Sequence, residues 1–376
     1  MFRNKKLALF FTTGVSLKTW EKVGNLGREV KPYNKFANYF DKIYFFTYGD
    51  ISDLNYQNVL DRDIKIFPKK WKIPSKLYSL LLPLAYRKEL KSVDILKTNQ
   101  MNGAIAAVLA KWFYKKKLIV RCGYEWLGFL ENGKSKKWKR IIVHILEKVI
   151  YQASDKIILT SKKDKKYVES KFDITSSKIK IIPNYIDTEL FRPMIVKKEE
   201  KRICIVCRLV EQKNLFNLIK AISSLSVKLV IFGEGSLKKS LEDYSKKQKV
   251  NVEFKGNILN QKLPEEINKS NLFILPSFYE GCPKVLLEAM SCGLPCIGTD
   301  VEGIREIIKH KDNGYLCETD ATSIKKAILD VLNNKELKER LSKNARKTIV
   351  NNYSLENILK EEEKNYELLR NTTITK

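Results

Sequence analysis

Residues 272–306, LFILPSFYEGCPKVLLEAMSCGLPCIGTDVEGIRE, constrain the fold more than any other part of the chain. The apolar run from Leu272 to Leu275 has the length of a buried strand and is too short for a helix. After a polar loop, Pro283 suits the start of a helix, where its missing N–H costs little. This helix is expected from Lys284 to about Cys292, and a second strand from Cys296 to Thr299. The stretch therefore predicts a strand–helix–strand unit of a parallel sheet.

Two acids, Glu280 and Glu288, belong to this unit. Glu280 lies in the loop at the carboxyl end of the strand, where such units bind ligands, and Glu288 follows on the helix. They are open to interpretation as a loop acid with a solvated helix acid, as a hydrolytic pair, or as acceptors of sugar hydroxyls. The two carboxylates of a hydrolytic pair stand a few Å apart on either side of one bond. Glu280 and Glu288 would be separated by roughly two helical turns, about 12 Å, if both were helical, which argues against a hydrolytic pair. Carboxylates do accept strong hydrogen bonds from hydroxyls.

The longer pattern E-G-C-P-K-V-L-L-E-A-M-S-C-G-L-P-C-I-G-T-D, followed by E-G-I-R-E and D-N-G-Y-L, resembles the donor site of the family 4 retaining glycosyltransferases. The resemblance implies the α/β GT-B architecture, in which two Rossmann-like domains with parallel sheets face each other across a cleft. It also implies that Glu280 contacts the transferred sugar and that Glu288 contacts the ribose of the nucleotide.

Two cations complete the expected catalytic group. Arg208 and Lys213 stand in C-R-L-V-E-Q-K-N, which is similar to the family's G-R-L-x-x-x-K-G, with Cys207 and Asn214 in place of two glycines. Fixed cations stabilise the charge that develops on a departing diphosphate. We therefore expect Glu280, Arg208 and Lys213 to be the catalytic residues.

The remaining expected site residues contact the donor or the acceptor. The donor-binding set is Glu288, Gly14, Gly233, Gly235, Gly256, Ile258, Gly281, Cys282, Pro283, Lys284 and Val285. Tyr124 and Glu125, which follow a predicted strand, are the acceptor-binding candidates, although a structural turn explains them nearly as well. Related enzymes carry a histidine where this chain has Cys122, so no role of that histidine is transferred.

Strand and helix patterns alternate throughout both halves, which is typical of parallel sheets covered by helices. We expect an acceptor-binding domain over 1–185, a nucleotide-sugar-binding domain over 186–352, and a last helix over 353–376 that crosses back to the first domain. The strands predicted in the first half are Leu7–Phe11, Lys42–Thr47, Ile64–Phe67, Ile95–Lys97, Leu118–Arg121, Lys156–Leu159 and Ile179–Ile182. The helices predicted between them are 76–91, 102–114, 136–152 and 162–172.

The patterns that suggest metal binding are interpreted as structural. Asp61 and Asp63 form a D-x-D that precedes a strand rather than ending one, which indicates a solvated turn. Cys204 and Cys207 are three residues apart in a strand pattern, so their side chains face opposite sides. No metal site and no cofactor are expected, and the nucleotide-sugar, UDP- or GDP-linked, is a substrate.

The net charge of +28 is concentrated in the first half. Residues 1–184 hold 38 Lys and Arg against 16 Asp and Glu, a balance of +22. Such a field implies an anionic partner. Residues 69–72 and the helix within 134–152 combine cations with aromatic and apolar residues, so this helix is expected to pack on the sheet, to contact a membrane surface, or both. Nucleic acid is not an expected partner, because no nucleic-acid-binding motif is present.

The family resemblance, together with these features, implies a metal-independent retaining glycosyltransferase that moves a sugar to a lipid-linked or polysaccharide acceptor for cell-surface glycans. With no apolar run of spanning length and no apolar core for a signal peptide, we expect it in the cytoplasm at the inner face of the membrane. The alternatives are a GT-B nucleotide-sugar epimerase without an acceptor and, from net charge alone, a nucleic-acid-binding protein.

Overall fold

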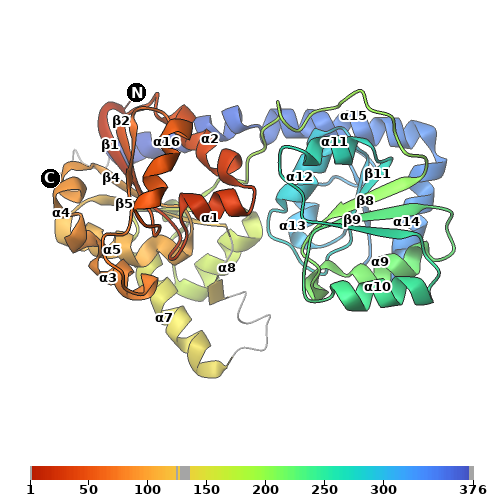
Figure 1. The fold of residues 1–376 in the computed structure, drawn as a ribbon, viewed down its shortest axis with the longest axis horizontal. Coiled ribbons are helices and arrows are strands. Elements are labelled where there is room, and N and C mark those ends of the chain that lie inside the picture. Colours follow the sequence, from red (N-terminus) through yellow and green to blue (C-terminus); the bar gives the residue numbers. More distant parts are fainter. Residues whose placement is uncertain (1, 124–125, 128–135, 372–376) are drawn as a thin grey trace. The chain divides into compact units, whose positions relative to one another are not determined.

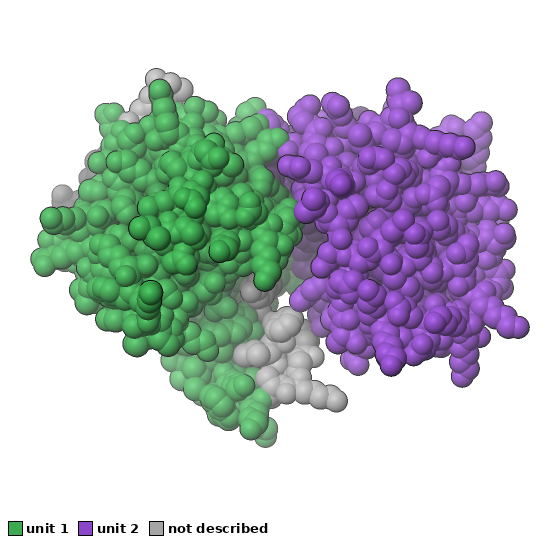
Figure 2. Space-filling view, viewed as in Figure 1, with its two compact units in different colours: residues 1–182, 359–376 green, residues 183–358 purple. Residues whose placement is uncertain are grey.

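The computed structural model describes residues 2–123, 126–127 and 136–371. The chain forms two compact units, which are coloured separately in Figure 2. Unit 1 contains residues 1–182 and 359–376, and unit 2 contains residues 183–358. Both are α/β units with one parallel sheet each, as predicted (Figure 1).

Unit 1 is built on a seven-stranded sheet of order β3-β2-β1-β4-β5-β6-β7. Its elements are β1 (Phe2–Phe10), α1 (Leu17–Lys22), α2 (Leu26–Phe36), β2 (Phe40–Phe46), η1 (Ile51–Val59), β3 (Ile64–Phe67), α3 (Ser75–Ala85), α4 (Arg87–Ser92), β4 (Ile95–Thr98), η2 (Met101–Gly103), α5 (Ala104–Tyr114), β5 (Lys117–Cys122), α7 (Lys137–Ala153), β6 (Lys156–Leu159), α8 (Lys162–Phe172), η3 (Ser176–Lys178) and β7 (Ile179–Ile181). The last helix, α16 (Leu355–Asn371), runs from unit 2 into unit 1.

Unit 2 is built on a six-stranded sheet of order β10-β9-β8-β11-β12-β13. Its elements are β8 (Arg202–Val206), η4 (Glu211–Lys213), α9 (Leu215–Ile222), β9 (Lys228–Phe232), α10 (Lys238–Lys247), β10 (Val252–Gly256), α11 (Leu263–Asn268), β11 (Leu272–Leu275), α12 (Lys284–Ser291), β12 (Cys296–Thr299), α13 (Glu302–Arg305), β13 (Tyr315–Cys317), α14 (Ala321–Asn333) and α15 (Lys335–Asn352).

The strand order of unit 1 fixes which helices share a face of its sheet. Crossovers between parallel strands are right-handed, so a change in the direction of travel along the sheet moves the connecting helices to the other face. The chain travels one way from β1 to β3 and the opposite way from β3 to β7. Helices α3, α5 and α7 therefore cover one face, and α1, α2 and η1 cover the other (Figure 1).

The two faces of the unit 2 sheet separate the cysteines of the C-x-x-C. Cys204 packs in the apolar cluster on one face, and Cys207 packs in the cluster on the other. Burial raises the pKa of Cys204 to about 11 and that of Cys207 to about 12, so both thiols stay protonated at neutral pH. The prediction that the two side chains face opposite sides of the strand is confirmed.

A buried charge cluster fastens α16 to the sheet of unit 1. Glu362 accepts from Lys97 Nζ at 2.5 Å and from Arg121 at 2.9 Å, and Lys97 is 2% exposed. Burial by itself would raise the pKa of Glu362, but attraction to Lys97 and Arg121 outweighs it and leaves that pKa lowered. Tyr366 packs edge-on against Phe36 of α2 beside this cluster.

Some details differ from the sequence-based prediction. The helix predicted over 76–91 is two helices, α3 and α4, because the backbone leaves helical geometry at Tyr86, whose ring packs on Phe46 and Phe67 of the sheet. Residues 183–185, assigned to the first domain, lie in unit 2. Asn184 donates there to the Cys282 carbonyl at 2.8 Å.

The start of α16 also belongs to unit 2, where Leu355 N donates to the Ile186 carbonyl at 3.0 Å. The D-x-D is a turn before β3, as predicted, and Asp63 pairs with Lys42 at 2.5 Å. Within the described residues, the structure contains no helix that combines the length and apolar character needed to cross a bilayer.

Candidate functional site

The loops at the carboxyl ends of β8 and β11 are fastened together in unit 2. Phe278 N donates to the Gln212 carbonyl at 2.9 Å, and Gln212 Nε2 donates to the Tyr279 carbonyl at 2.8 Å. Asn214 Nδ2 donates to the carbonyls of Pro276, at 2.9 Å, and Thr319, at 2.7 Å. These bonds place the segment that carries Lys213 directly against the segment that carries Glu280.

Asn214 replaces a glycine of the family pattern, and its backbone conformation explains why this replacement is tolerated. Its φ is +54°, in the left-handed region that glycine adopts without strain and asparagine tolerates better than most residues. The position that usually carries glycine in the family therefore keeps its backbone geometry here. The amide side chain adds the two loop contacts that a glycine could not make.

Lys213 and Glu280 meet at the centre of this arrangement. Lys213 Nζ lies 2.5 Å from Glu280 Oε1, and the two side chains are only 12% and 8% exposed. Ser277 Oγ donates to the same carboxylate oxygen at 2.6 Å. The Ser277 carbonyl in turn accepts from Thr299 Oγ1 at 2.5 Å. Glu280 is thus held by an ammonium and a hydroxyl, which fix its orientation at the end of β11.

Cys207 lies close to this ion pair. Burial raises the pKa of Cys207, Lys213 lowers it and Glu280 raises it. The thiol therefore contributes a neutral, apolar wall beside the two charges. Its backbone is approached closely by Gly233, whose φ is +129° and where a Cβ would stand 1.9 Å from the Cys207 carbonyl oxygen. Only glycine fits at that position.

Gly303, at the start of α13, supports the Glu280 loop from the other side. A Cβ on Gly303 would lie 2.1 Å from the Gly281 carbonyl oxygen and 2.4 Å from that of Glu280. A Cβ on Gly281 would meet nothing within 4 Å. Gly303 is therefore required by packing, whereas Gly281 leaves open space in front of the loop.

The remaining predicted donor residues of unit 2 follow the ends of neighbouring strands. Glu288 lies on α12 and is 2% exposed. Pro283 is the residue before the first helical residue of α12, and Lys284 stacks over the Tyr185 ring at 5.4 Å. Cys282, Val285 and Ile258 are partly buried against the apolar cluster under α12.

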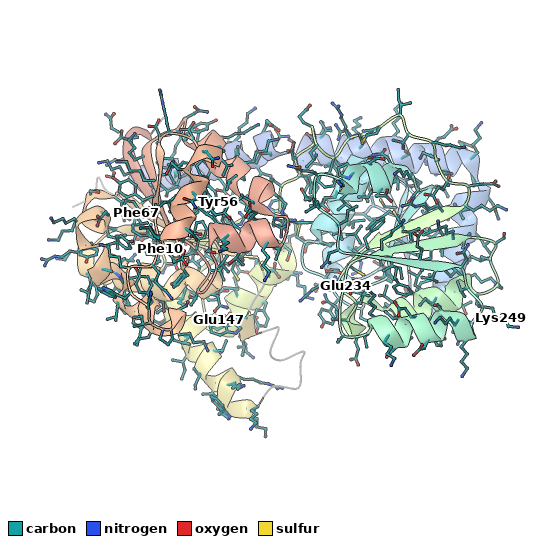
Figure 3. All side chains as sticks on the ribbon, viewed as in Figure 1. Phe10, Tyr56, Phe67, Glu147, Glu234 and Lys249 are labelled. Atoms are coloured by element: carbon teal, nitrogen blue, oxygen red, sulfur yellow. The ribbon has the colours of Figure 1, made fainter. Side chains whose placement is uncertain are left out.

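The glycines after β9 and β10 leave little room around them. At Gly235 a Cβ would be 2.3 Å from the Leu209 carbonyl oxygen. At Gly256, whose φ is +69°, it would be 2.9 Å from Glu234 Oε1. Glu234, labelled in Figure 3, also pairs with Lys238 at 2.9 Å. These glycines let three loops lie closely side by side at the carboxyl edge of the sheet.

The remaining predicted site residues are Gly14, Arg208, Tyr124 and Glu125. Gly14 follows β1 in unit 1 and has a φ of +84°, and Tyr124 and Glu125 lie outside the described residues. Arg208 is in unit 2 and exposed, and its side chain makes no hydrogen bond or ion pair within the part of the chain that the structure describes. Its guanidinium is available to a ligand.

Sequence reasoning missed Ser277, Thr299 and Gln212. Ser277 stands three residues before Glu280, just after an apolar strand. A hydroxyl residue in that position was the only feature of the sequence that could have indicated a contact with Glu280. Gln212 could not be recognised, because its role depends on a contact with a loop 67 positions further along the chain.

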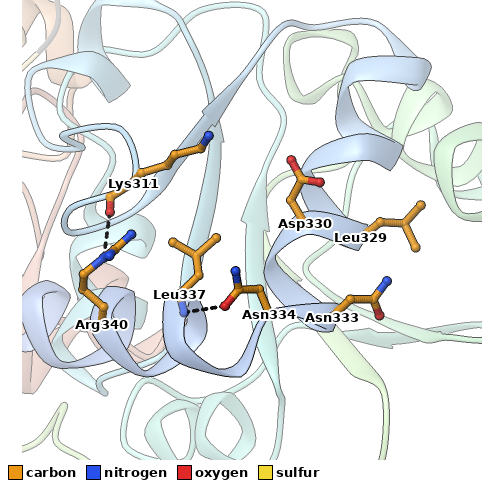
Figure 4. A pocket seen from close by; sticks show the side chains of 7 residues that line it. All are labelled: Lys311, Leu329, Asp330, Asn333, Asn334, Leu337 and Arg340. Carbon is orange, nitrogen blue, oxygen red and sulfur yellow. Dashed lines mark hydrogen bonds between the residues drawn. The ribbon is translucent and has the colours of Figure 1, made fainter.

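A separate hollow of about 510 Å³ lies between the end of α14 and the start of α15 (Figure 4). Asn334 caps α15 there by accepting from Leu337 N at 2.9 Å, and Arg340 donates to the Lys311 carbonyl at 3.2 Å. Since α14 starts after β13 and runs back along the sheet, this hollow is at the amino edge. It is therefore distant from the loops that carry Lys213 and Glu280.

Comparison with known proteins agrees with the fold. The family model described as glycosyl transferases group 1 matches residues 187–348, and the glycosyltransferase family 4 model matches residues 42–190. The chain belongs to the family 4 glycosyltransferases, with the GT-B fold.

Two curated relatives illustrate the similarity. The chain is 32% identical over 239 residues to an uncharacterized glycosyltransferase of Methanocaldococcus jannaschii, covering 58% of this chain and 61% of that protein. It is 30% identical over 250 residues to the UDP-Gal:alpha-D-GlcNAc-diphosphoundecaprenol alpha-1,3-galactosyltransferase of Escherichia coli, covering 61% and 64%. The chain therefore spans less than two thirds of the length of either relative.

Solved structures share the fold over nearly the whole chain. Sucrose-phosphate synthase from Thermosynechococcus elongatus superposes with a TM-score of 0.78 at 19% identity, covering 98% of this chain and 100% of that one. Anabaena HepE in complex with UDP-glucose superposes with a TM-score of 0.76 at 14% identity, covering 96% and 99%.

Proposed function

We propose that this chain transfers a sugar from a nucleotide-sugar to a lipid-linked or polysaccharide acceptor, with retention at the anomeric carbon and without a divalent metal. The observation that carries the proposal is the buried contact of Lys213 and Ser277 with Glu280 at the carboxyl edge of the unit 2 sheet. The similarity to the Escherichia coli galactosyltransferase, whose name specifies UDP-Gal and a diphosphoundecaprenol-linked sugar, supports the donor and acceptor classes.

The proposed division of roles follows from charge. Glu280 is an anion fixed by two donors, so it suits hydrogen bonds from the hydroxyls of the transferred sugar. Lys213 has three N–H donors and uses one on Glu280, so the others can reach a diphosphate. Arg208 adds a planar fork that binds phosphate oxygens. Glu288 is assigned to the ribose by the family resemblance.

The proposed chemical step needs no protein nucleophile. The bond between the sugar C1 and the phosphate oxygen breaks, and the nucleoside diphosphate leaves with the bonding electron pair. The acceptor oxygen forms the new bond on the same face of C1, and the departing phosphate takes the acceptor's proton. Arg208 and Lys213 stabilise the charge on the phosphate as it develops, which is why a divalent ion is not required.

We further propose that unit 1 works at the cytoplasmic face of a membrane. The balance of +22 over residues 1–184 supports this, because each cation near an anionic surface contributes about 1 kcal/mol. The burial of the helix within 134–152 is compatible with this proposal. In α7 one face is buried on unit 1 and the opposite face is exposed.

Incubation with UDP- and GDP-sugars, with and without bacterial lipid extract and in the presence of EDTA, tests the function. We expect sugar to enter the lipid fraction only when extract is present, with full activity in EDTA. Release of an altered free sugar without acceptor would show an epimerase instead. Activity that is abolished by EDTA and restored by manganese would contradict the metal-independent site. A thermal-shift panel of UDP, GDP and ADP identifies the base, because a ligand of the native state raises its melting temperature.

A further inference from the structure

Helix α3 is apolar on its outer side as well as on its buried side. Tyr78 and Leu82 face the interior of unit 1. Leu77, Leu80 and Leu84 lie on the opposite side and are 48% to 57% exposed. A helix at the surface of a soluble domain normally carries polar residues on its outer face. Three leucines at this spacing form an apolar stripe without a partner in the described chain.

The end of helix α5 extends this stripe. Trp112 and Phe113 are each 54% exposed at the last turn of α5. The two helices are neighbours on one face of the sheet, and their ends are joined because Tyr114 Oη donates to the Pro83 carbonyl at 2.7 Å. The aromatic pair of α5 therefore lies at the same end of the layer as Leu84.

Helix α7 adds a third apolar stripe to the same layer. Its buried residues, Val143, Glu147, Ile150 and Tyr151, define the face that packs on unit 1. The exposed apolar residues recur three or four positions apart on the opposite face and are 39% to 60% exposed. They are Trp138, Ile141, Ile142, Ile145 and Val149. Because α7 also neighbours α5, the three helices that carry these residues belong to one layer (Figure 1).

The charges on and around these helices indicate what kind of partner the exposed apolar residues contact. Helices α3, α5 and α7 contain a single acidic residue, Glu147, which is labelled in Figure 3. It is buried and accepts from the backbone N–H of Trp126 and Leu127. Residues 69–117 hold 12 Lys and Arg against two acids, and Lys136, Lys137, Lys139 and Arg140 begin α7. A surface that combines apolar side chains with an excess of cations matches an anionic lipid interface.

We propose that the exposed apolar residues of α3, α5 and α7, named here the outer helical face, insert into the surface of an anionic membrane. The face consists of Leu77, Leu80, Leu84, Trp112, Phe113, Trp138, Ile141, Ile142, Ile145 and Val149. This deepens the proposed function, since it specifies how unit 1 binds the membrane. Its test needs neither donor nor acceptor, so failure of one does not imply failure of the other.

Insertion predicts a response to salt that electrostatic attraction alone does not. Surface charge interactions reach about 10 Å at 0.1 M salt but only about 3 Å at 1 M. Apolar contacts with the acyl region are not screened. Lysines should therefore bring the protein to the membrane, and the outer helical face should then hold it there at high salt.

Sedimentation with vesicles of phosphatidylcholine mixed with phosphatidylglycerol tests this proposal. The full chain is bound at low salt and then transferred to about 1 M salt. We expect the wild type to remain largely on the vesicles. The triple variant Leu77→Ser, Leu80→Ser and Leu84→Ser should be released, with binding at high salt lowered roughly tenfold or more. Its melting temperature should be unchanged, because these side chains are exposed.

A matched control uses exposed apolar residues on the other face of the same sheet. Ile51 and Leu54 of η1 are 76% and 42% exposed, so Ile51→Ser with Leu54→Ser removes similar apolar surface without touching the outer helical face. This control should bind like the wild type. Tryptophan fluorescence should be quenched by bromine-labelled lipid, and Trp112→Phe with Trp138→Phe should reduce that quenching.

Three outcomes would overturn the proposal. In the first, the wild type leaves the vesicles completely at high salt, which indicates electrostatic attachment only. In the second, the control and the leucine variant lose binding equally. In the third, the wild type ignores anionic vesicles and instead self-associates, and the leucine variant is monomeric, which assigns the face to a second copy of the chain.

Discussion

Replacing Glu280 by glutamine tests the role of the buried ion pair without altering its shape. The glutamine carbonyl oxygen can still accept from Ser277, whose hydroxyl lies 2.6 Å from the carboxylate, so the loop should keep its conformation. The charge that faces Lys213 at 2.5 Å is lost. A sugar hydroxyl that binds this carboxylate would lose a charged hydrogen bond worth about 1.5–3 kcal/mol. Turnover should therefore fall roughly ten- to a hundredfold, and up to a thousandfold if the contact tightens in the transition state.

Nucleotide binding should respond differently in the same variant. Lys213 loses the carboxylate that it pairs with and becomes a stronger ligand for a diphosphate, so the affinity for the nucleoside diphosphate should stay the same or increase. Initial rates at saturating donor, together with calorimetric titration of the nucleotide, separate the two effects. Wild-type turnover in Glu280→Gln would remove Glu280 from the reaction. Loss of nucleotide binding with intact turnover per bound donor would mean that it holds the nucleotide.

Further substitutions test the surroundings of the site and the anchoring of α16. Gly303→Ala should lower both the melting temperature and the turnover, because the added Cβ would clash with the carbonyls of the Glu280 loop. Gly281→Ala, where the added Cβ meets nothing within 4 Å, should leave the melting temperature unchanged. Equal melting temperatures of the two variants would contradict this packing argument. Ser277→Ala should lower turnover severalfold, and Ser277→Thr should restore part of it; steady-state rates show whether the hydroxyl orients the carboxylate. Glu362→Gln should destabilise the protein by about 3–5 kcal/mol in denaturant unfolding, because buried cations lose their partner. The pKa of Glu362 is lowered in the folded state, so its carboxylate stabilises the folded protein fully above the unfolded pKa near 4.5. This contribution is lost as the pH falls through the lower, folded-state pKa. The free energy of unfolding of Glu362→Gln should therefore depend less on pH in the acid range.

Most of the fold could be predicted because parallel strands covered on both faces have continuous apolar sequences. Leu272–Leu275 is such a run, and the following proline and glycine bound the helix after it. The strand Tyr315–Cys317 was missed, since three residues carry too little pattern. The break between α3 and α4 was missed too, because it depends on the packing of Tyr86 against the sheet.

The site could be predicted as a set of residues but not as a geometry. The resemblance identified Glu280 and Lys213 separately, and their contact depends on hydrogen bonds that the carbonyl and the side-chain amide of Gln212 make with a distant loop. Two glycines that look equivalent in sequence, Gly281 and Gly303, have opposite surroundings in space. The apolar pattern within 134–152 likewise indicated a helix that packs on the sheet, contacts a membrane surface, or both, without showing which of its residues are buried.

Calorimetric titration of nucleoside diphosphates in the presence of EDTA tests the central claim most directly. For the base identified by the thermal-shift panel, the wild type should bind one nucleotide per chain without metal. Arg208→Ala and Lys213→Ala should each weaken that binding by roughly tenfold or more. Lys239→Ala, which removes an exposed cation of α10, should have no effect. Equal affinity in all four proteins, or binding that appears only when manganese is added, would contradict the proposed diphosphate site at Arg208 and Lys213.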